Sequence, residues 1–363
     1  MTTISRFDTR LQRVALTRPW AADVTSVGIV ATHVVRSDGA EGWGFSWTPQ
    51  IGATAVHALL SDDIAHAAIG RPAEPGDAWH GLWEHLHEAG GGGITTIALA
   101  GLDLALWDAE ARARDLPVSG VIGRRRERVR AYGSGVNLHY TQAELLAQVQ
   151  RWIDAGFDAV KIKVGKPDVA EDVDRVGAVR DLLGPDRELM IDANQRWDLS
   201  RATSSIEALS RFDLAWIEEP LRADDLEGHT ELARRIDVPI AVGENLHNAH
   251  RFADFLRAGA AQIVQPNIVR IGGITPFQRI AQLASEHGAA LHPHLLPELS
   301  GQLALTLLGD VAEPWAEDVE DAGFAALGAL EDPSPVAIAD GHLTETPHVG
   351  LGIRFSLVLT GKA

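Results

Sequence analysis

Residues 158–164 read Asp-Ala-Val-Lys-Ile-Lys-Val, a short apolar run that carries two lysines one residue apart. Runs of this kind are typical of strands that are covered on both faces of a parallel sheet. Similar runs recur along the chain, and amphipathic stretches with helical spacing separate them. We expect strands over residues 130–134, 158–164, 188–193, 214–218, 240–244, 262–266 and 289–294. Seven or eight strand–helix units in roughly 200 residues favour a β/α-barrel over an open sheet.

The N-terminal part of the chain has a different pattern. Residues 1–50 consist of β-branched runs broken by turn signals, which indicates strands joined by tight turns. Residues 53–69 and 95–114 instead carry apolar residues at helical spacing. Strands followed by helices indicate a small α+β domain rather than a continuation of the barrel.

We therefore expect three parts in a chain of the α/β class. An N-terminal α+β capping domain covers residues 1–125, and a (β/α)7–8 barrel covers residues 126–325. The alternation of strands and helices stops near residue 325. The C-terminal segment, residues 326–363, is expected to return to the capping domain and to complete it.

The composition limits the partners and the compartment. The chain has 363 residues with 50 acidic and 32 basic side chains, so its formal charge of −18 makes nucleic acid and anionic membranes unfavourable partners. It has no cysteine, which excludes disulfides and thiolate metal sites. The first residues lack the apolar core of a signal peptide, and no apolar run reaches 18 residues. We expect a cytoplasmic protein without a membrane span.

A polar residue closes each predicted barrel strand from the second onward. These residues follow one another at intervals of 23 to 29 positions: Lys163, Asp192, Glu218, Glu244, Asn267 and His294. One strand–helix unit of a barrel takes roughly 25 to 30 residues, so each of them falls one unit after the last. We expect all of them at the carboxyl ends of the strands, on the rim where barrel enzymes hold their active sites.

Three of these residues are carboxylates from consecutive strands: Asp192, Glu218 and Glu244. Converging carboxylates repel one another and are unfavourable to desolvate unless a cation compensates. Oxygen ligands alone suit a hard ion, and Mg²⁺ fits best because it keeps positions open for water and substrate. The alternative is that each acid pairs with an arginine or is solvated, but the regular interval favours a metal site.

The two lysines of the opening stretch point the same way. Residues i and i+2 of a strand share a face, so Lys161 and Lys163 both reach into the barrel mouth. Two desolvated lysines beside each other and near a cation are expected to have lowered pKa values, as a general base needs. The alternative, two surface lysines on an edge strand, conflicts with their apolar neighbours.

His294 ends the seventh predicted strand and faces the lysines across the rim. It can add or remove a proton on the opposite face of a substrate. A satisfied core histidine is the alternative interpretation of this residue.

Read together and in order, the strand-end motifs resemble those of a known family. The motifs are Lys161-Ile162-Lys163, Ile191-Asp192-Ala193-Asn194-Gln195, Trp216-Ile217-Glu218-Glu219-Pro220, Gly243-Glu244-Asn245, Arg270-Ile271-Gly272-Gly273-Ile274-Thr275 and His294. In this order and at barrel spacing they resemble the mandelate racemase branch of the enolase superfamily. Residues 100–108, Ala-Gly-Leu-Asp-Leu-Ala-Leu-Trp-Asp, look like the helical signature of that family's capping domain. The resemblance covers nearly the whole chain.

The resemblance implies roles for the strand-end residues. It implies that Asp192, Glu218 and Glu244 bind Mg²⁺, and that Lys163 is an acid/base catalyst. Lys161 is implied to tune Lys163 and to help bind the carboxylate of a small-molecule substrate.

Further implied residues lie on the other side of the substrate and in the cap. His294 becomes the acid/base on the opposite face, and Glu317 matches an acid that hydrogen-bonds a substrate carboxylate oxygen. Asn194 is expected to face the substrate. In this fold the specificity loops come from the capping domain, here around residues 17–23, so Trp20 is expected to contact substrate. Barrels of this type form dimers or octamers, and we expect a homo-oligomer.

One residue departs from the family pattern. In mandelate racemase and many acid-sugar dehydratases the sixth strand carries an Asp paired with the histidine, and in the muconate-lactonizing branch that position is a lysine. Here it is Asn267. An amide can orient the imidazole of His294 but cannot stabilise imidazolium as a carboxylate would. Its pKa is therefore expected to be lower than in a His–Asp pair, which disfavours a racemase with two bases.

The expected reaction starts with removal of the proton next to a carboxylate, which gives an enediolate. Dehydration of a sugar acid to a 2-keto-3-deoxy acid fits best, with Lys163 as base and His294 as acid. A cycloisomerase that opens a lactone or anhydro ring is the first alternative, and a racemase or epimerase of a 2-hydroxy or amino acid is the second. A non-catalytic protein that binds acids remains a fourth interpretation.

Overall fold

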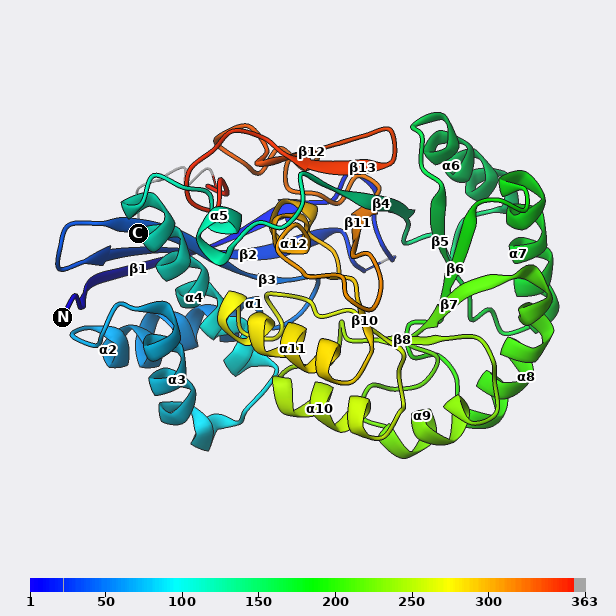
Figure 1. Cartoon of the computed structure of the whole chain (residues 1–363), viewed down its shortest axis with the longest axis horizontal. Coiled ribbons are helices and arrows are strands. Elements are labelled where there is room, and N and C mark those ends of the chain that lie inside the picture. The colour runs from blue at the N-terminus through cyan, green and yellow to red at the C-terminus, as the bar shows by residue number, and fades with distance from the viewer. Residues whose placement is uncertain (22, 356–363) are drawn as a thin grey trace.

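The capping domain is built on a three-stranded antiparallel sheet (Figure 1). The computed structural model describes residues 1–21 and 23–355. The strands β1 (Ile4–Ala15), β2 (Ser26–Arg36) and β3 (Glu41–Thr48) are neighbours in the sheet in chain order. One face of this sheet is covered by α4 (Ile94–Ala113), which packs along β2 and β3 and is buried nearly all round.

Further helices complete the capping domain. They are α1 (Ala53–Leu59), the π-helical turn η1 (Leu60–Ile64), α2 (Ala65–Ala68), α3 (Pro75–His85), the 3₁₀ turn η2 (His87–Ala89) and α5 (Val118–Ile122). Of these, α1, α3 and α5 contact α4. The helix predicted over residues 53–69 is thus present, with one wider turn in its middle, whereas α3 was not predicted. Among the helices in the described part of the chain, none combines the length and apolarity that crossing a membrane requires.

The second domain is a barrel of short parallel strands. Within residues 1–21 and 23–355 its eight parallel strands are β4 (Arg128–Ser134), β5 (Ala159–Lys163), β6 (Glu188–Asp192), β7 (Leu214–Glu218), β8 (Ile240–Val242), β9 (Ile263–Val264), β10 (Ala290–Leu291) and β11 (Trp315–Val319). They pair in parallel from β4 to β10 in chain order, and β11 pairs with β4. Their side chains are almost all buried, which explains the apolar runs of the sequence.

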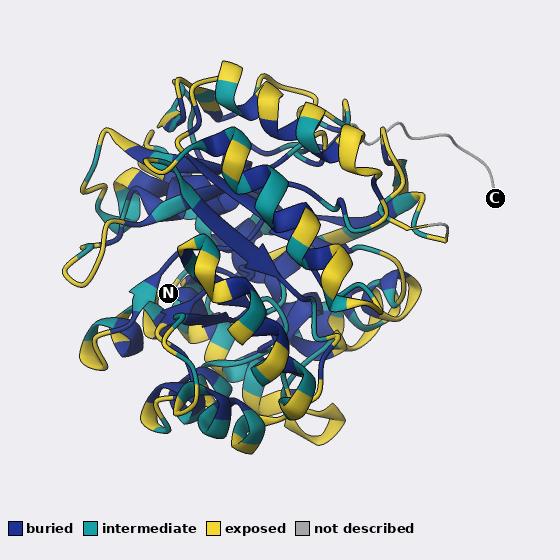
Figure 2. Ribbon diagram, turned by 90° about the vertical axis from the view of Figure 1, so that its right-hand side faces the viewer, coloured by how far each residue is buried: buried dark blue, intermediate teal, exposed yellow. Residues whose placement is uncertain are grey.

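Helices connect the strands and form the outer layer. They are α6 (Gln142–Asp154), α7 (Val169–Leu183), α8 (Leu199–Leu209) with the 3₁₀ turn η3 (Ser210–Phe212), α9 (Leu226–Ala233), α10 (Ala249–Arg257), α11 (Ile274–Glu286) and α12 (Pro297–Ala304). α6 shows why they form: Thr141 and Glu144 make a reciprocal capping box at its start. Figure 2 shows the buried strands inside and the helices with exposed outer faces.

The barrel closes between β10 and β11 through side chains. The N–H of Trp315 donates to His292 Nδ1 over 3.1 Å, and the N–H of Leu295 donates to Glu317 Oε2 over 2.8 Å. β11 was not among the predicted strands, because its sequence, Trp-Ala-Glu-Asp-Val, carries two acids in place of an apolar run.

The C-terminal segment contacts both domains. The hairpin β12 (Val336–Ala339) and β13 (His342–Glu345) extends the barrel sheet by pairing with β4, which the sequence pattern did not indicate. Beyond it, the N–H of Leu351 donates to Asp108 in α4 over 2.7 Å, and the ring of Phe355 lies 5.2 Å from that of Phe45 in β3. These contacts support our proposal that the segment completes the capping domain; residues 356–363 lie outside the described residues.

Candidate active site

The two lysines of β5 lie inside the barrel at the carboxyl end of the strand. Lys161 is 1% exposed, and its Nζ lies 2.6 Å from Glu218 Oε2 and 2.7 Å from Glu317 Oε1. Burial lowers the pKa of Lys161, but these two carboxylates outweigh it and hold that pKa well above its ordinary value. Lys161 is therefore a fixed positive charge at the base of the site.

Lys163 pairs with a different acid. Its Nζ donates to Asp192 Oδ2, and its backbone N–H donates to Asn137 Oδ1 over 2.9 Å. Burial lowers the pKa of Lys163, but the carboxylates of Asp192, Glu218 and Glu244 together outweigh burial, so the net shift is upward. The lowered pKa values predicted for Lys161 and Lys163 beside a cation are not found in this arrangement of side chains alone, because carboxylates lie against both ammonium groups.

The three predicted carboxylates come together at adjacent strand ends. Asp192 and Glu218 are the last residues of β6 and β7 and are partners in the parallel ladder. Glu244 follows β8 by two residues, after Gly243. A side chain at Gly243 would meet the backbone of Gln265 at 2.6 Å, so only glycine lets these neighbouring chains approach so closely.

The buried acids are incompletely satisfied by the protein. Asp192 accepts the N–H of Asn194 over 2.7 Å as well as the Lys163 bond. Glu218 is 1% exposed, and its Oε1 has no hydrogen-bond partner among the described residues. Burial raises the pKa of Glu218 to about 7, and Asp192 adds to the effect. An ionised Glu218 therefore needs positive charge beyond what Lys161 supplies.

Three residues of the site were not predicted individually. Glu219, directly after Glu218, is also buried, and its two carboxylate oxygens accept from Asn245 Nδ2 over 2.8 and 2.9 Å; the same amide also donates to Glu244 Oε1 over 2.9 Å. Arg270 donates to the backbone carbonyl of Glu244 over 2.9 Å and to the Asn245 side chain. The signal was present in the doublet Glu218-Glu219, but strand alternation places the second acid outward. Glu219 instead has a φ of 41°, which ends the strand and redirects the side chain.

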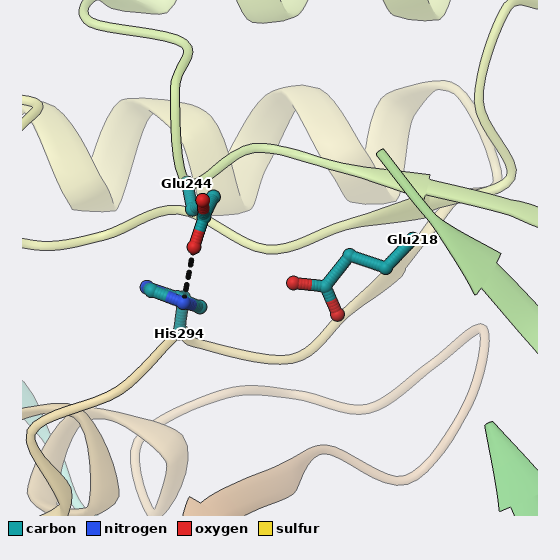
Figure 3. A group of neighbouring side chains, drawn as sticks. All are labelled: Glu218, Glu244 and His294. Carbon is teal, nitrogen blue, oxygen red and sulfur yellow. Dashed lines mark ion pairs between the residues drawn. The ribbon is translucent and has the colours of Figure 1, made fainter. Parts of the chain in front are cut away.

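The donor set fits a divalent cation. The described residues place five carboxylates in this cluster: Asp192, Glu218, Glu219, Glu244 and Glu317. Three cationic side chains face them: Lys161, Lys163 and Arg270. Full ionisation leaves two negative charges unbalanced with a neutral His294 and one with a protonated His294. Oxygen donors suit a hard ion. Figure 3 shows Glu218, Glu244 and His294, whose ligand atoms lie within 4.8 Å of one another.

His294 is held from both sides of its ring. Its Nε2 lies 2.6 Å from Glu244 Oε2, and its Nδ1 lies 3.1 Å from Asn267 Nδ2. The backbone N–H of Arg270 donates to Asn267 Oδ1 over 3.1 Å, so the amide oxygen is already engaged and the NH₂ group must face the imidazole. Nδ1 therefore accepts a hydrogen bond, and the proton of the neutral ring is on Nε2.

Two influences on His294 oppose each other. Burial lowers its pKa, but Glu244 and Glu317 outweigh burial and raise it. The NH₂ group of Asn267 acts the other way, because an imidazolium would place an N–H against that donor. The amide geometry sets the tautomer of the neutral ring, since an N–H cannot donate to another donor.

The remaining predicted residues divide into two groups. Glu317 lies in the cluster, and although burial raises its pKa, Lys161 and His294 lower it to about 2, so it is ionised. Asn194 lies beside Asp192, to whose Oδ2 its amide donates over 3.2 Å. Trp20 lines a cavity of about 70 Å³ together with Tyr140 and Arg151, and none of the charged residues of the cluster is among its walls. Contact of Trp20 with substrate stays a prediction.

Comparisons with known proteins agree with this architecture over most of the chain. Residues 144–357 match the model of the enolase C-terminal domain-like family. Residues 6–123 match the mandelate racemase/muconate lactonizing enzyme N-terminal domain. The chain belongs to the mandelate racemase/muconate lactonizing enzyme family. It is therefore an enzyme of the enolase superfamily, as the strand-end motifs predicted.

Members of the mandelate racemase/muconate lactonizing enzyme family that resemble this chain carry out different reactions. A 3,6-anhydro-α-L-galactonate cycloisomerase from Streptomyces coelicolor is 35% identical over 92% of this chain and 91% of that protein. A solved structure of L-talarate dehydratase from Polaromonas sp. JS666, complexed with Mg and L-glucarate, has a TM-score of 0.89 and 35% identity, covering 98% and 96% of the two chains. A racemase structure from Streptomyces coelicolor A3(2) with bound magnesium has a TM-score of 0.90 and 32% identity, covering 97% of each chain.

Proposed function

We propose that this enzyme removes the α-proton of a sugar acid with the help of Mg²⁺ and then expels an oxygen from the β-carbon. The observation that carries the proposal is the buried charged cluster, in which the base Lys163 and the imidazole of His294 both border the carboxylates. Relatives named as a dehydratase and a cycloisomerase, one of them with bound Mg and L-glucarate, support the same class of reaction.

We propose Asp192, Glu218 and Glu244 as the Mg²⁺ ligands. They provide carboxylate oxygens from three consecutive strands, and one of those oxygens, Glu218 Oε1, is buried without a partner among the described residues. When bound, Mg²⁺ would act as a Lewis acid toward the substrate carboxylate and so make its α-proton more acidic.

The two lysines have separate roles in the proposed reaction, and Glu317 helps to hold one of them. Lys161 is held by Glu218 and Glu317, so it stays protonated and offers a positive charge to the substrate carboxylate. Lys163 takes the α-proton at Nζ in its neutral form. Its ammonium would lose the pairing with Asp192 that raises its pKa once that carboxylate holds Mg²⁺. It is the less buried of the two, at 9% exposed against 1%, which suits the residue that must reach the substrate.

His294 acts on the departing oxygen. The electron pair left by the α-proton forms the new C=C bond while the C–O bond at the β-carbon breaks and the oxygen leaves with that bond's electrons. The Nε2–H of His294 donates a hydrogen bond to this oxygen. A hydroxyl leaves as hydroxide and takes a proton from solvent to become water, and the proton on Lys163 returns to solvent after turnover. The enol that remains tautomerises to a 2-keto-3-deoxy acid, the product of a dehydratase.

Ring opening is the second candidate, and the orientation of Asn267 favours it. Because the Asn267 amide donates to His294 Nδ1, the imidazole is a weak source of protons. The ring oxygen of a lactone leaves as a carboxylate, which needs no proton, whereas hydroxide does. A cycloisomerase therefore makes smaller demands on His294 than a dehydratase does.

Proton NMR in D₂O with Mg²⁺ tests the proposal over a panel of mono- and diacid sugars, their lactones and anhydro forms. Loss of an α-proton with a new deoxy methylene signal is the expected result, and the starting compound distinguishes dehydratase from cycloisomerase. Exchange of the α-proton without a new carbon skeleton would contradict elimination and point to a racemase or epimerase.

A further inference from the structure

The barrel helix α11 is capped by a residue of the other domain. α11 begins after Gly273, which has no side chain to cap its first N–H groups. Asp103, in the middle of α4, fills that role: its Oδ2 accepts the N–H of Thr275 over 3.0 Å, and its Oδ1 accepts the Thr275 hydroxyl over 2.5 Å. Asp103 is 2% exposed, so this helix cap joins the two domains inside the protein.

The fit at this junction is close. Gly273 has a φ of 109°, and a side chain there would meet Asp103 Oδ2 at 2.2 Å. Two tryptophans of the capping domain add hydrogen bonds nearby: Trp107 donates to the Thr275 hydroxyl over 3.1 Å, and Trp79 donates to the carbonyl of Gly272 over 2.8 Å. The capping domain thus holds residues 272–275 at several points.

A hydrogen-bonded loop connects this junction to the candidate active site. The N–H of Ile271 donates to the carbonyl of Asn267 over 3.1 Å, and the N–H of Gly273 donates to that of Ile268 over 2.8 Å. Within the same loop, the N–H of Arg270 fixes the Asn267 amide that faces His294. The loop therefore has little freedom to move at one end without moving at the other.

We propose that Asp103 is a positioning residue for His294. It holds the loop of residues 267–275 from the capping domain, and the loop fixes the amide of Asn267, which sets the tautomer of the imidazole. The catalytic meaning of this role rests on the proposed function, whereas the link between Asp103 and the His294 ring does not.

α4 offers a matched control for testing this role. Asp108 is equally buried in the same helix, but it accepts the N–H groups of Trp43 and Leu351 and pairs with Arg112, all outside the loop. Asp103→Asn removes one acceptor at the loop, and Asp108→Asn removes one in the cap alone. Both changes are expected to lower the unfolding midpoint.

The deciding measurement is ¹⁵N NMR of histidine-labelled, Mg²⁺-loaded protein, with the His294 ring signals assigned by their loss in His294→Gln. The wild-type protein should show the Nε2–H tautomer. Asp103→Asn should move the His294 signals toward a mixture of tautomers, and Asp108→Asn should leave them in place. Wild-type His294 signals in Asp103→Asn, or equal movement in both variants, would overturn the proposal.

Kinetics and a second variant complete the test. With a turned-over sugar acid, Asp103→Asn should lower kcat roughly tenfold and leave KM within about twofold, because the substrate still binds but meets a misplaced group. Thr275→Val removes the hydroxyl from the other side of the contact and should move the same signals even if Asp103→Asn fails to fold. If no sugar acid reacts, the proposed function fails, and the substrate-free NMR result still decides the role of Asp103.

Discussion

Lys161 and Lys163 stand two residues apart on β5, yet their surroundings make them chemically different. Lys161 contacts two carboxylates and is fully enclosed, while Lys163 contacts one and is partly accessible. Strand periodicity predicted that both would face the barrel interior, and they do. It could not predict which acid each would meet, because that depends on the lengths and bends of neighbouring strand ends.

Replacing the proposed base should stop the first step alone. Lys163→Ala is expected to lower exchange of the substrate α-proton with D₂O by about a thousandfold or more, since no other base occupies that position. Mg²⁺ binding, followed by isothermal titration calorimetry, should persist. The control variant Lys166→Ala, changed on the loop after β5, should catalyse exchange of the substrate α-proton at the wild-type rate. Near-wild-type exchange in Lys163→Ala would refute the assignment.

The contact between Asn267 and His294 Nδ1 predicts that Asn267→Asp gains proton exchange on the second face of the substrate. Asn267→Asp supplies a carboxylate that accepts Nδ1–H, which stabilises imidazolium and raises the pKa of His294. We expect proton exchange on the second face to increase roughly tenfold relative to elimination, visible as epimerised substrate recovered from D₂O. Asn267→Ala, which adds no charge, should show no such gain. Unchanged stereochemistry in Asn267→Asp would mean that His294 does not reach the α-carbon.

Among the elements, the parallel strands were predictable because burial on both faces leaves a run of apolar side chains. β11 was not predicted because Glu317 and Asp318 interrupt that run. α3 was not predicted because its sequence begins at Pro75 within a stretch that looks like a turn. The strand-end residues were predicted from their spacing. Glu219, Asn245 and Arg270 lie just past strand ends, where backbone turns rather than periodicity set direction.

β11 carries a further acid whose effect depends on pH. Burial raises the pKa of Asp318 to about 6, and Glu298 is the largest of several carboxylates that add to the rise. The folded protein therefore binds this proton more tightly than the unfolded chain, whose pKa is near 3.8. The contribution of Asp318 to the free energy of unfolding is therefore fully present below about pH 4 and is lost as the pH rises through about 6.

Asp318→Asn should remove this dependence. Between pH 4 and pH 7.5 the wild type should lose up to about 3 kcal/mol more of its free energy of unfolding than the variant does. This is the free energy that corresponds to a pKa shift of about two units. Urea unfolding at the two pH values measures the difference. Asp332→Asn serves as the control, because Asp332 is not among the carboxylates that raise the pKa of Asp318. Parallel pH curves for the wild type and Asp318→Asn would contradict the prediction.

For the whole molecule, the unbalanced charge of the cluster predicts a strong response to metal. Mg²⁺ at about a hundred times its Kd should stabilise the fold by about 2.7 kcal/mol, and chelation should reverse the gain. Thermal unfolding at pH 8 with Mg²⁺ or with chelator measures it. Glu218→Gln should lose most of the response, while Glu227→Gln on the surface of α9 should keep it. An equal response in both variants would place the metal elsewhere.

The contact between Asp103 and Thr275 also bears on how such a protein can be recombined. A chimera that takes its capping domain from a relative and its barrel from this chain crosses over near residues 123–128, in the gap between the two domains. That crossover looks harmless along the sequence, yet it separates Asp103 and Trp79 from the loop they hold. Chimera libraries that exchange capping domains to change the substrate range should therefore take Asp103, Trp79 and the loop of residues 267–275 from the same parent protein.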